Sequence, residues 1–327
     1  MAAPTNTRET YSSVGLREDL SNIIYNISPT DTPFLSGCGR ESADNTLFEW
    51  QTDALSPVAA DRQVEGDDLA ASAVQQPTRV TNYTQISAKA VQTSGSAEAV
   101  DWAGRRSTQA YQLAKRAKEM KRNMESMLTA NIGKGAGAAA GTPAVARITG
   151  GLGSWVATNY DSIGSGSPAP AAGSGDGVTA AVDAPTQVAL AEANMRTVIK
   201  ECFDSGGSPD TILCGSFNKQ SLSALSQSVS DLRTNTSGDK PASVIAAVDV
   251  YVSDFGTFKI LADRFQRARD MWFIDFDFWA VAYLRPFKTE TLAKTGDSIK
   301  QMLIAEYGLM SKNEASSGFL ADLTTSA

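Results

Sequence analysis

The hydrophobic pattern at the start of the chain predicts a short amphipathic helix followed by an extended arm. The apolar positions of this stretch are Leu16, Leu20, Ile23, Ile24 and Ile27. Their helical spacing places them on one face, and Pro29 and Pro33 then prevent the helix from continuing. An arm with one apolar face needs a surface to lie on. The residues expected to contact that surface are Leu20, Ile23, Ile24 and Phe34.

Two strand-like stretches, Thr46–Gln51 and Val80–Val91, flank a long polar segment. The second has the period of two that strands show, and we expect the two stretches to pair. The intervening Asp53–Pro77 is far longer than a common hairpin loop and too polar to form its own core. It predicts a projecting wing, with a solvated surface loop as the alternative. The charged residues expected to make its polar contacts are Asp61, Arg62, Glu65, Asp67 and Asp68.

An amphipathic pattern from about Ala99 to Ile132 predicts one long helix. Its apolar seam consists of Ala110, Leu113, Ala117, Met120, Met124 and Met127. A helix of about 30 residues at 1.5 Å each would be about 45 Å long. The other faces carry lysine and arginine, but Glu119 and Glu125 interrupt the positive charge. This favours a structural spine over a helix that binds nucleic acid or a membrane.

Beyond this helix the composition changes. Gly133–Pro185 is rich in glycine, alanine and serine, which predicts loose loops around one ordered patch, GGLGSWVATNY. Helices are predicted at Gln187–Phe203 and Ser216–Leu232. The predicted strands are Thr211–Cys214, Val248–Val252, Phe258–Leu261, Met271–Ile274, Trp279–Leu284, Phe287–Leu292 and Ile299–Ser311. Because helices and long strands are segregated rather than alternating, the fold class is predicted to be α+β.

Bulk composition indicates a soluble globular protein with room for about two domains. The 327 residues are 42% hydrophobic and carry a net charge of −7, and the sequence has no apolar run long enough for a membrane span. The acidic balance disfavours a protein that grips nucleic-acid phosphates. Histidine is absent, and Cys38, Cys202 and Cys214 are far apart in sequence. We therefore expect buried free thiols, no metal site and no cofactor.

One catalytic motif remains as an alternative. Ser216–Lys219 matches S-x-x-K and Lys294–Gly296 matches K-T-G, two motifs of penicillin-recognising serine enzymes. In such an enzyme Ser216 would be the nucleophile and Lys219 part of the proton relay. However, S-D-N does not occur, the interval between the motifs is short, and no export signal is visible. Ser216 as a helix cap is the simpler interpretation. Asp275 and Asp277 could bind a cation, although turn and capping roles are commoner for such pairs.

Three stretches resemble the major capsid proteins of tailed bacteriophages, which have the Hong Kong 97-like shell fold. They are REDLSNIIYNISPTDTPFL in the arm, GGLGSWVATN at Gly150–Asn159 and EYGLMSKNEASSGFLADL at Glu306–Leu323. The resemblance implies an N-terminal arm (1–44), an extended loop (45–92), a peripheral domain with a spine helix (93–185), an axial domain (186–278) and return strands of the peripheral domain (279–327).

The resemblance also implies a function. The chain would be a structural protein without enzymatic activity that self-assembles into pentamers and hexamers of an icosahedral head enclosing double-stranded DNA. The arm and wing residues named above would then be subunit contacts. Scaffolding, portal and decoration proteins would be its partners, DNA would be enclosed without sequence-specific binding, and no membrane would be involved. The protein would reside in the virion after assembly in the host cytoplasm. An encapsulin-like compartment shell, which shares the fold, is the nearer alternative.

Overall fold

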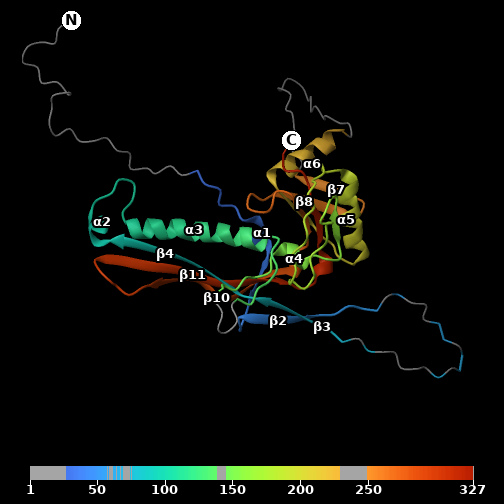
Figure 1. The fold of residues 1–327 in the computed structure, drawn as a ribbon, viewed down its shortest axis with the longest axis horizontal. Coiled ribbons are helices and arrows are strands. Elements are labelled where there is room, and N and C mark those ends of the chain that lie inside the picture. Colours follow the sequence, from blue (N-terminus) through green and yellow to red (C-terminus); the bar gives the residue numbers. More distant parts are fainter. Residues whose placement is uncertain are drawn as a thin grey trace, which may run out of the picture.

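Two β-sheets and one long helix organise the chain, and a two-stranded wing projects from them (Figure 1). The computed structural model describes residues 27–56, 58, 62–63, 65–66, 68, 74, 76–137, 145–228 and 249–326. Nearly all of the predicted N-terminal helix lies outside these residues. So do five of the predicted contact residues, which are Leu20, Ile23, Ile24, Asp61 and Asp67. None of the described helices is long and apolar enough to cross a bilayer.

The first sheet has four strands in the order β1, β10, β11, β4. Their bounds are Gly39–Ser42 for β1, Gln85–Ser94 for β4, Trp279–Thr291 for β10 and Ser298–Ser311 for β11. β11 is antiparallel to both of its neighbours, and β1 joins the edge parallel to β10. Helix α3 (Thr108–Leu128) lies along this sheet, where Met120 packs against Leu303 and Ala305 of β11. β11, the last of the predicted strands, thus packs against the long helix.

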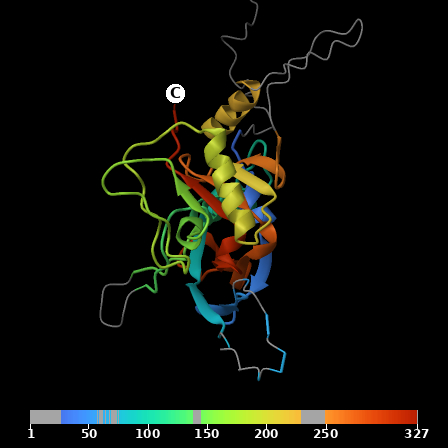
Figure 2. The same ribbon diagram turned by 90° about the vertical axis from the view of Figure 1, so that its right-hand side faces the viewer.

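The second sheet has six strands in the order β5, β12, β9, β6, β8, β7. Their bounds are Tyr160–Ser162 for β5, Thr211–Cys214 for β6, Val250–Ser253 for β7, Gly256–Ala262 for β8, Met271–Ile274 for β9 and Gly318–Ala321 for β12. Helices α5 (Glu192–Asp204) and α6 (Ser216–Ser228) pack beside it, and Figure 2 views this end of the molecule. β12 comes from the end of the chain, so the C-terminal segment contributes to both sheets.

The sequence predicted most strands but placed two boundaries differently. β6, β9 and the β7–β8 hairpin lie where predicted. The stretch Val80–Val91 contains two strands, because β3 (Thr78–Tyr83) pairs with β2 (Leu47–Thr52) while β4 pairs with β11. Conversely, the two strands predicted within 279–292 are one strand, β10. Its register shifts twice around Pro286, since proline has no N–H for the ladder.

Helix α3 is shorter than the predicted helix at 99–132. It begins directly after Ser107, whose hydroxyl accepts the Ala110 N–H at 3.2 Å and so caps the first turn. The residues before it form a separate short helix, α2 (Gly95–Ala99). Gly104 lies between the two helices with φ of 76°, a conformation that glycine adopts without strain. With 21 residues, α3 is about 31 Å long instead of about 45 Å.

The body of the chain begins earlier than the predicted arm border after residue 44. Pro33 opens helix α1 (Pro33–Gly37), because the first helical position needs no N–H. Phe34 is 0% exposed, and its ring centroid lies 6.1 Å from that of Phe276 and 6.2 Å from that of Trp279. The prediction that Phe34 contacts a surface outside its own chain is therefore wrong, since its side chain fills the chain's own core.

Two further sequence predictions are confirmed. The patch within the glycine-rich segment is ordered, with Leu152 and Trp155 of helix α4 (Leu152–Trp155) fully buried. All three cysteines are buried free thiols. Burial raises the pKa of Cys202 and of Cys214 to about 12, so neither is a reactive thiolate near neutral pH.

The base of the wing is fixed on the first sheet by aromatic side chains of β2. The Trp50 Nε1–H donates to the Ser311 carbonyl at 2.7 Å, and its ring packs 5.4 Å from Trp155. The Phe48 ring lies directly over Gly308 of β11, where any added Cβ would overlap it. Beyond Thr52 and Thr78, the last paired residues, the wing runs away from the body and from α3 (Figure 1).

We expect Gly308→Ala to lower the free energy of unfolding by about 1–3 kcal/mol, because the added methyl group overpacks the site beneath Phe48. Gly39→Ala, on an edge strand of the same sheet, is the matched control. A Cβ there meets its nearest atom at 3.5 Å, so its effect should stay within about 0.5 kcal/mol. Urea denaturation followed by circular dichroism measures both variants. Equal stability of the two would contradict the packing described for Gly308.

Candidate assembly interface

The wing beyond its paired strands is acidic, and its described residues are exposed. Asp53–Pro77 contains five acidic residues and one arginine, a net charge of −4. Of the contact residues predicted in the wing, Arg62, Glu65 and Asp68 are described, and all three are exposed. The segment also presents apolar side chains to solvent. Leu55 is 98% exposed, Val58 105% and Val74 84%.

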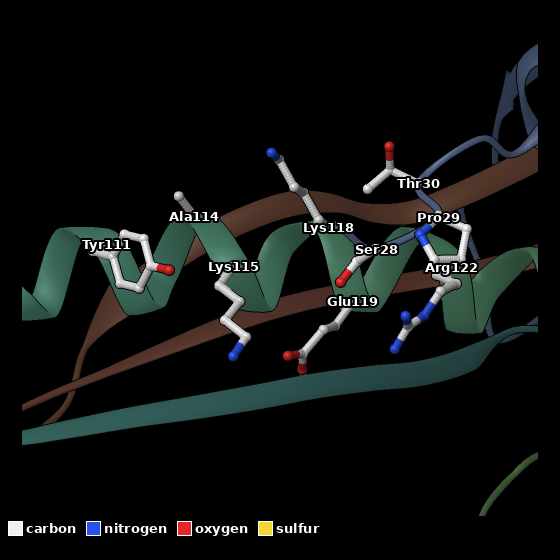
Figure 3. Close-up of a pocket in the computed structure, with 9 residues that line it drawn as sticks. All are labelled: Ser28, Pro29, Thr30, Tyr111, Ala114, Lys115, Lys118, Glu119 and Arg122. Atoms are coloured by element: carbon white, nitrogen blue, oxygen red, sulfur yellow. The ribbon is translucent and has the colours of Figure 1, made fainter. Parts of the chain in front are cut away.

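A groove lies between the arm and α3 on another face of the molecule (Figure 3). Ser28, Pro29 and Thr30 form one wall, and three turns of α3 form the other. The α3 residues are Tyr111, Ala114, Lys115, Lys118, Glu119 and Arg122. Its volume is about 550 Å³, which is large enough for several side chains of a second polypeptide.

The groove is positively charged although Glu119 lines it. The Glu119 carboxylate binds Lys89 of β4 at 2.9 Å and Arg116 at 2.7 Å. These two hydrogen-bonded cations lower the pKa of Glu119 to about 2, so its charge is already compensated from within the chain. Lys115 and Lys118 have no ion-pair partner among the described residues. The groove therefore offers unpaired cations to whatever lies in it.

The orientation of the wing depends on a buried amide that the sequence did not single out. Asn82 of β3 is 0% exposed, and its Nδ2 donates to the Leu309 carbonyl at 2.6 Å and to the Thr149 hydroxyl at 3.0 Å. Its Oδ1 accepts the Gly150 N–H at 3.0 Å. This network joins β3, β11 and the GGLG stretch, and it fixes the direction in which the wing leaves the sheet.

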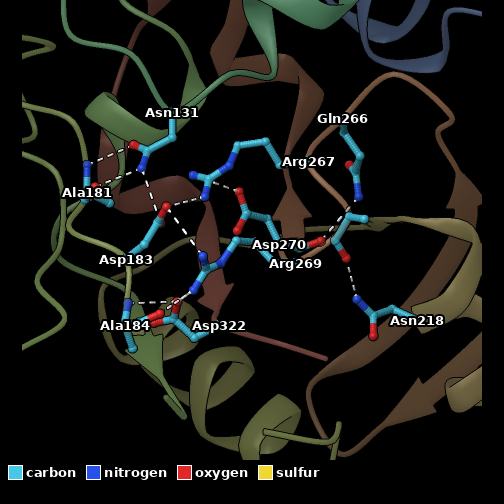
Figure 4. Close-up of polar contacts among 11 residues, drawn as sticks. Asn131, Ala181, Asp183, Ala184, Asn218, Gln266, Arg267, Arg269, Asp270 and Asp322 are labelled. Atoms are coloured by element: carbon cyan, nitrogen blue, oxygen red, sulfur yellow. Dashed lines mark hydrogen bonds and ion pairs between the residues drawn. The ribbon is translucent and has the colours of Figure 1, made fainter. Parts of the chain in front are cut away.

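A second polar cluster fastens the long segment before α5 to the six-stranded sheet (Figure 4). Asp183 lies 2.5 Å from Arg267 and 3.6 Å from Arg269, and Arg269 also pairs with buried Asp322. Burial raises the pKa of the neighbouring Asp270 to about 7. The segment at 145–185, predicted to be mostly loose, is held in place by this cluster, which hydrophobic patterning does not reveal.

The candidate catalytic and cation-binding residues have structural partners. Lys219 binds Asp249 at 3.0 Å and the Ile260 carbonyl at 3.4 Å, which joins α6 to β8 and the residue before β7. The Asp275 carboxylate accepts the Asp277 N–H at 3.2 Å and caps a short 3₁₀ turn, as the commoner interpretation had it. Within the described ranges, no group of three or more acidic or cysteine side chains could hold a metal ion.

Comparison with known proteins connects this architecture to viral shells. Among curated proteins, the major capsid protein of Escherichia phage Phieco32 is 29% identical over 349 aligned positions, which cover 98% of this chain and 97% of that protein. Among solved structures, the capsid of cyanophage A-1(L) matches with a TM-score of 0.67 at 14% identity, covering 95% of this chain and 98% of that one. The encapsulin SrpI of Synechococcus elongatus matches with a TM-score of 0.55 at 9% identity, covering 96% and 98%.

The structural matches show a shared fold, and this is the Hong Kong 97-like fold of phage capsids. The encapsulin has the same fold, so the fold by itself does not separate a phage head from a bacterial compartment. The family-level comparison does, because the model of the SU10 major capsid protein matches residues 3–324, nearly the whole length. This chain belongs to the SU10 major capsid protein family.

Proposed function

We propose that many copies of this chain assemble into pentamers and hexamers, and that these close into an icosahedral head around double-stranded DNA. The family match supports the proposal most directly, because it extends over both sheets, the long helix and the wing. Assembly in the host cytoplasm, with scaffolding and portal proteins and with decoration proteins on the finished head, is part of the same proposal.

The observation that carries this proposal is the exposed apolar surface of the projections. Leu55, Val58 and Val74 on the wing and Ile27 at the start of the described arm are at least 84% exposed. They contact almost nothing in their own chain, and such surface is removed from water when a neighbouring subunit covers it. A projection can bury the 2,000 Å² or so that is typical of obligate contacts without enlarging the core.

The wing tip is proposed to lie in the arm–α3 groove of the next copy. The wing carries a net charge of −4, while Lys115, Lys118 and Arg122 give the groove its positive charge. The wing leaves the body in a direction away from α3 of the same chain (Figure 1). The two surfaces are therefore on different subunits when they meet. A contact between two unlike surfaces closes into rings when its rotation permits, as capsomers require.

The arm residues Leu20, Ile23 and Ile24 are proposed to make a second contact between subunits. They lie outside the described residues, so their support comes from the apolar helical pattern and from the exposure of Ile27 next to them. Asp61 and Asp67 of the wing, also outside the described residues, are assigned to the first contact with Arg62, Glu65 and Asp68.

We also propose that the protein has no catalytic role. A penicillin-recognising enzyme would need Lys219 free to exchange a proton with Ser216, whereas this lysine is bound to Asp249 and to the Ile260 carbonyl. The family match favours a phage head over an encapsulin-like shell, and the identity of the enclosed cargo tests that choice.

Replacing Asp53–Pro77 by the two residues Asn-Gly should leave a folded subunit that forms no shells. Thr52 and Thr78 are paired across β2 and β3, so a two-residue turn closes the hairpin without changing its register. Circular dichroism and thermal unfolding should match the unaltered protein, while negative-stain electron microscopy should show no particles. Intact shells from this variant would remove the wing from the assembly mechanism.

The matched control replaces the same residues by a glycine–serine linker of equal length. It keeps the spacing between β2 and β3 but removes every charge and apolar side chain of the wing. We expect it to fail in assembly as the short turn does, since chain length alone supplies no contact surface. Shells from the linker variant would mean that the wing acts only as a spacer.

Reversing the charges of the groove should block assembly, and reversing the wing as well should restore it. Lys115→Glu with Lys118→Glu places two carboxylates where the acidic wing is proposed to lie. Asp67→Lys with Asp68→Lys makes the opposite change on the wing. Each pair should reduce the yield of shells at least tenfold by light scattering and electron microscopy, and all four changes together should recover it.

The control for charge reversal alters two exposed lysines elsewhere, Lys259→Glu with Lys294→Glu, which gives the same change in net charge. It should assemble like the unaltered protein. If the four-residue variant is no better than either pair, the wing and the groove are not partners. The shell proposal would stand and only this pairing would fall.

A further inference from the structure

The arm is attached to the body through a buried carboxylate of the long helix. Glu125 of α3 is 0% exposed. Its Oε1 accepts the Phe34 N–H and its Oε2 accepts the Leu35 N–H, each at 2.7 Å. Because Pro33 occupies the first position of α1 and has no N–H, these are the first two free donors of that helix. Glu125 thus caps α1 from another helix.

A second carboxylate meets Glu125 from the six-stranded sheet. Asp263 directly follows β8 and is 2% exposed. Its Oδ1 accepts the Phe265 N–H at 2.8 Å, while its Oδ2 is buried without a donor among the described residues. Asp263 is close enough to Glu125 that its charge and its carboxyl group raise the pKa of Glu125. Two carboxyl groups can share a hydrogen bond only when one of them carries a proton.

No cation compensates this pair among the described residues. Neither Glu125 nor Asp263 forms an ion pair with a lysine or arginine there. On α3 itself, the Arg122 guanidinium lies over the Phe265 ring, 5.8 Å from its centroid. From α1, the neighbouring titratable group is the buried thiol of Cys38, which the nearby Glu125 charge helps to keep protonated. Asp31, on the approach to α1, is exposed.

The electrostatic consequence follows from burial. Loss of contact with water, together with the neighbouring carboxylate, raises the pKa of Glu125 to about 7, although the two N–H donors act against this. Burial likewise raises the pKa of Asp263. Near neutral pH the site therefore changes between one shared proton and two adjacent negative charges.

We propose that Glu125 and Asp263 form a proton-operated joint between the arm, the long helix and the six-stranded sheet. With one shared proton, the pair holds α1 against α3 and α3 against the residues after β8. Without that proton, the two carboxylates repel each other and the attachment of α1 weakens. The joint rests on contacts within one chain and does not depend on the proposed shell function.

The direction of the pH dependence follows from linkage. When α1 detaches, Glu125 becomes solvated and returns to its ordinary pKa of about 4.5, so the attached state binds the proton more tightly. The attachment of α1 is strongest below about pH 4.5, the pKa of the detached Glu125. It weakens as the pH rises from about 4.5 to about 7, by up to tenfold per pH unit for one proton, and stays constant above that window.

Hydrogen exchange of the full chain between pH 5.5 and 8 tests the joint. The probe is the peptide that contains the Phe34 and Leu35 amides, with rates divided by the intrinsic rate at each pH. Its opening equilibrium should rise roughly tenfold per pH unit up to about pH 7 and then level off. Amides of the buried strand β6 serve as an internal reference and should not follow this curve, which separates local detachment from global unfolding.

Two variants should abolish the pH dependence in opposite ways. In Asp263→Asn the side-chain amide can donate to Glu125 at every pH, so the probe should stay protected throughout. In Glu125→Gln the side chain offers one acceptor oxygen instead of two, so protection should be low throughout. Asp31→Asn is the matched control, an equal change at an exposed position beside α1, and it should keep the curve of the unaltered protein.

A curve that is flat in the unaltered protein, or unchanged in both Asp263→Asn and Glu125→Gln, would refute a joint that depends on a proton. If Asp263→Asn does not fold, Glu125→Gln alone still distinguishes a flat curve from a sloping one. A shift of the curve in Asp31→Asn equal to that in Asp263→Asn would assign the effect to general charge rather than to the buried pair.

Discussion

The central strand β11 carries a buried carboxylate, Glu306. Its binding partners come from three other parts of the chain, and they hold those parts together. Glu306 is 3% exposed. It binds Arg147 at 2.5 Å and Arg285 at 2.8 Å, and it accepts the Thr84 hydroxyl at 2.9 Å. A buried charge that loses one partner costs several kcal/mol, so none of these side chains can move alone. Arg147 lies in the segment before α4, Arg285 in β10 and Thr84 at the junction of β3 with β4. One charge therefore joins the sheet, the wing base and the long connecting segment.

Apolar packing and polar contacts have different roles in this chain. One apolar core spans both sheets, because Trp279 and Tyr307 of the first sheet pack in the same cluster as Trp272 of the second. Hydrophobic burial therefore stabilises the junction of the two sheets as well as each half. Polar, directional contacts between distant segments add to this packing, as in the bonds of Asn82 and the pairing of Arg269 with Asp322. Directional bonds specify one arrangement where apolar surfaces would tolerate several. This arrangement keeps the wing base and the arm attachment in fixed positions relative to each other.

Periodicity in the sequence predicted α5, α6, the β7–β8 hairpin and β11, because these depend on local burial patterns. It did not predict that Val80–Val91 divides at Thr84, since the division follows from the bond of that hydroxyl with Glu306, more than two hundred residues away. Phe34 shows a similar limit. The sequence shows that this apolar side chain should be covered, but not whether its own chain or another chain covers it. The acidic wing was visible in the sequence. The basic groove was not, because its charge depends on Lys89 of β4 compensating Glu119.

The two projections are attached by chemically different means, and this separates their responses to pH. The wing base is held by the packing of Phe48 and Trp50 and by the amide of Asn82, none of which gains or loses a proton near neutral pH. The arm is attached through α1, whose first free N–H groups are capped by the titratable Glu125. Acidity can therefore change how firmly the arm is attached while the direction of the wing stays constant. The attachment of the wing is therefore constant near neutral pH, while that of the arm is adjustable.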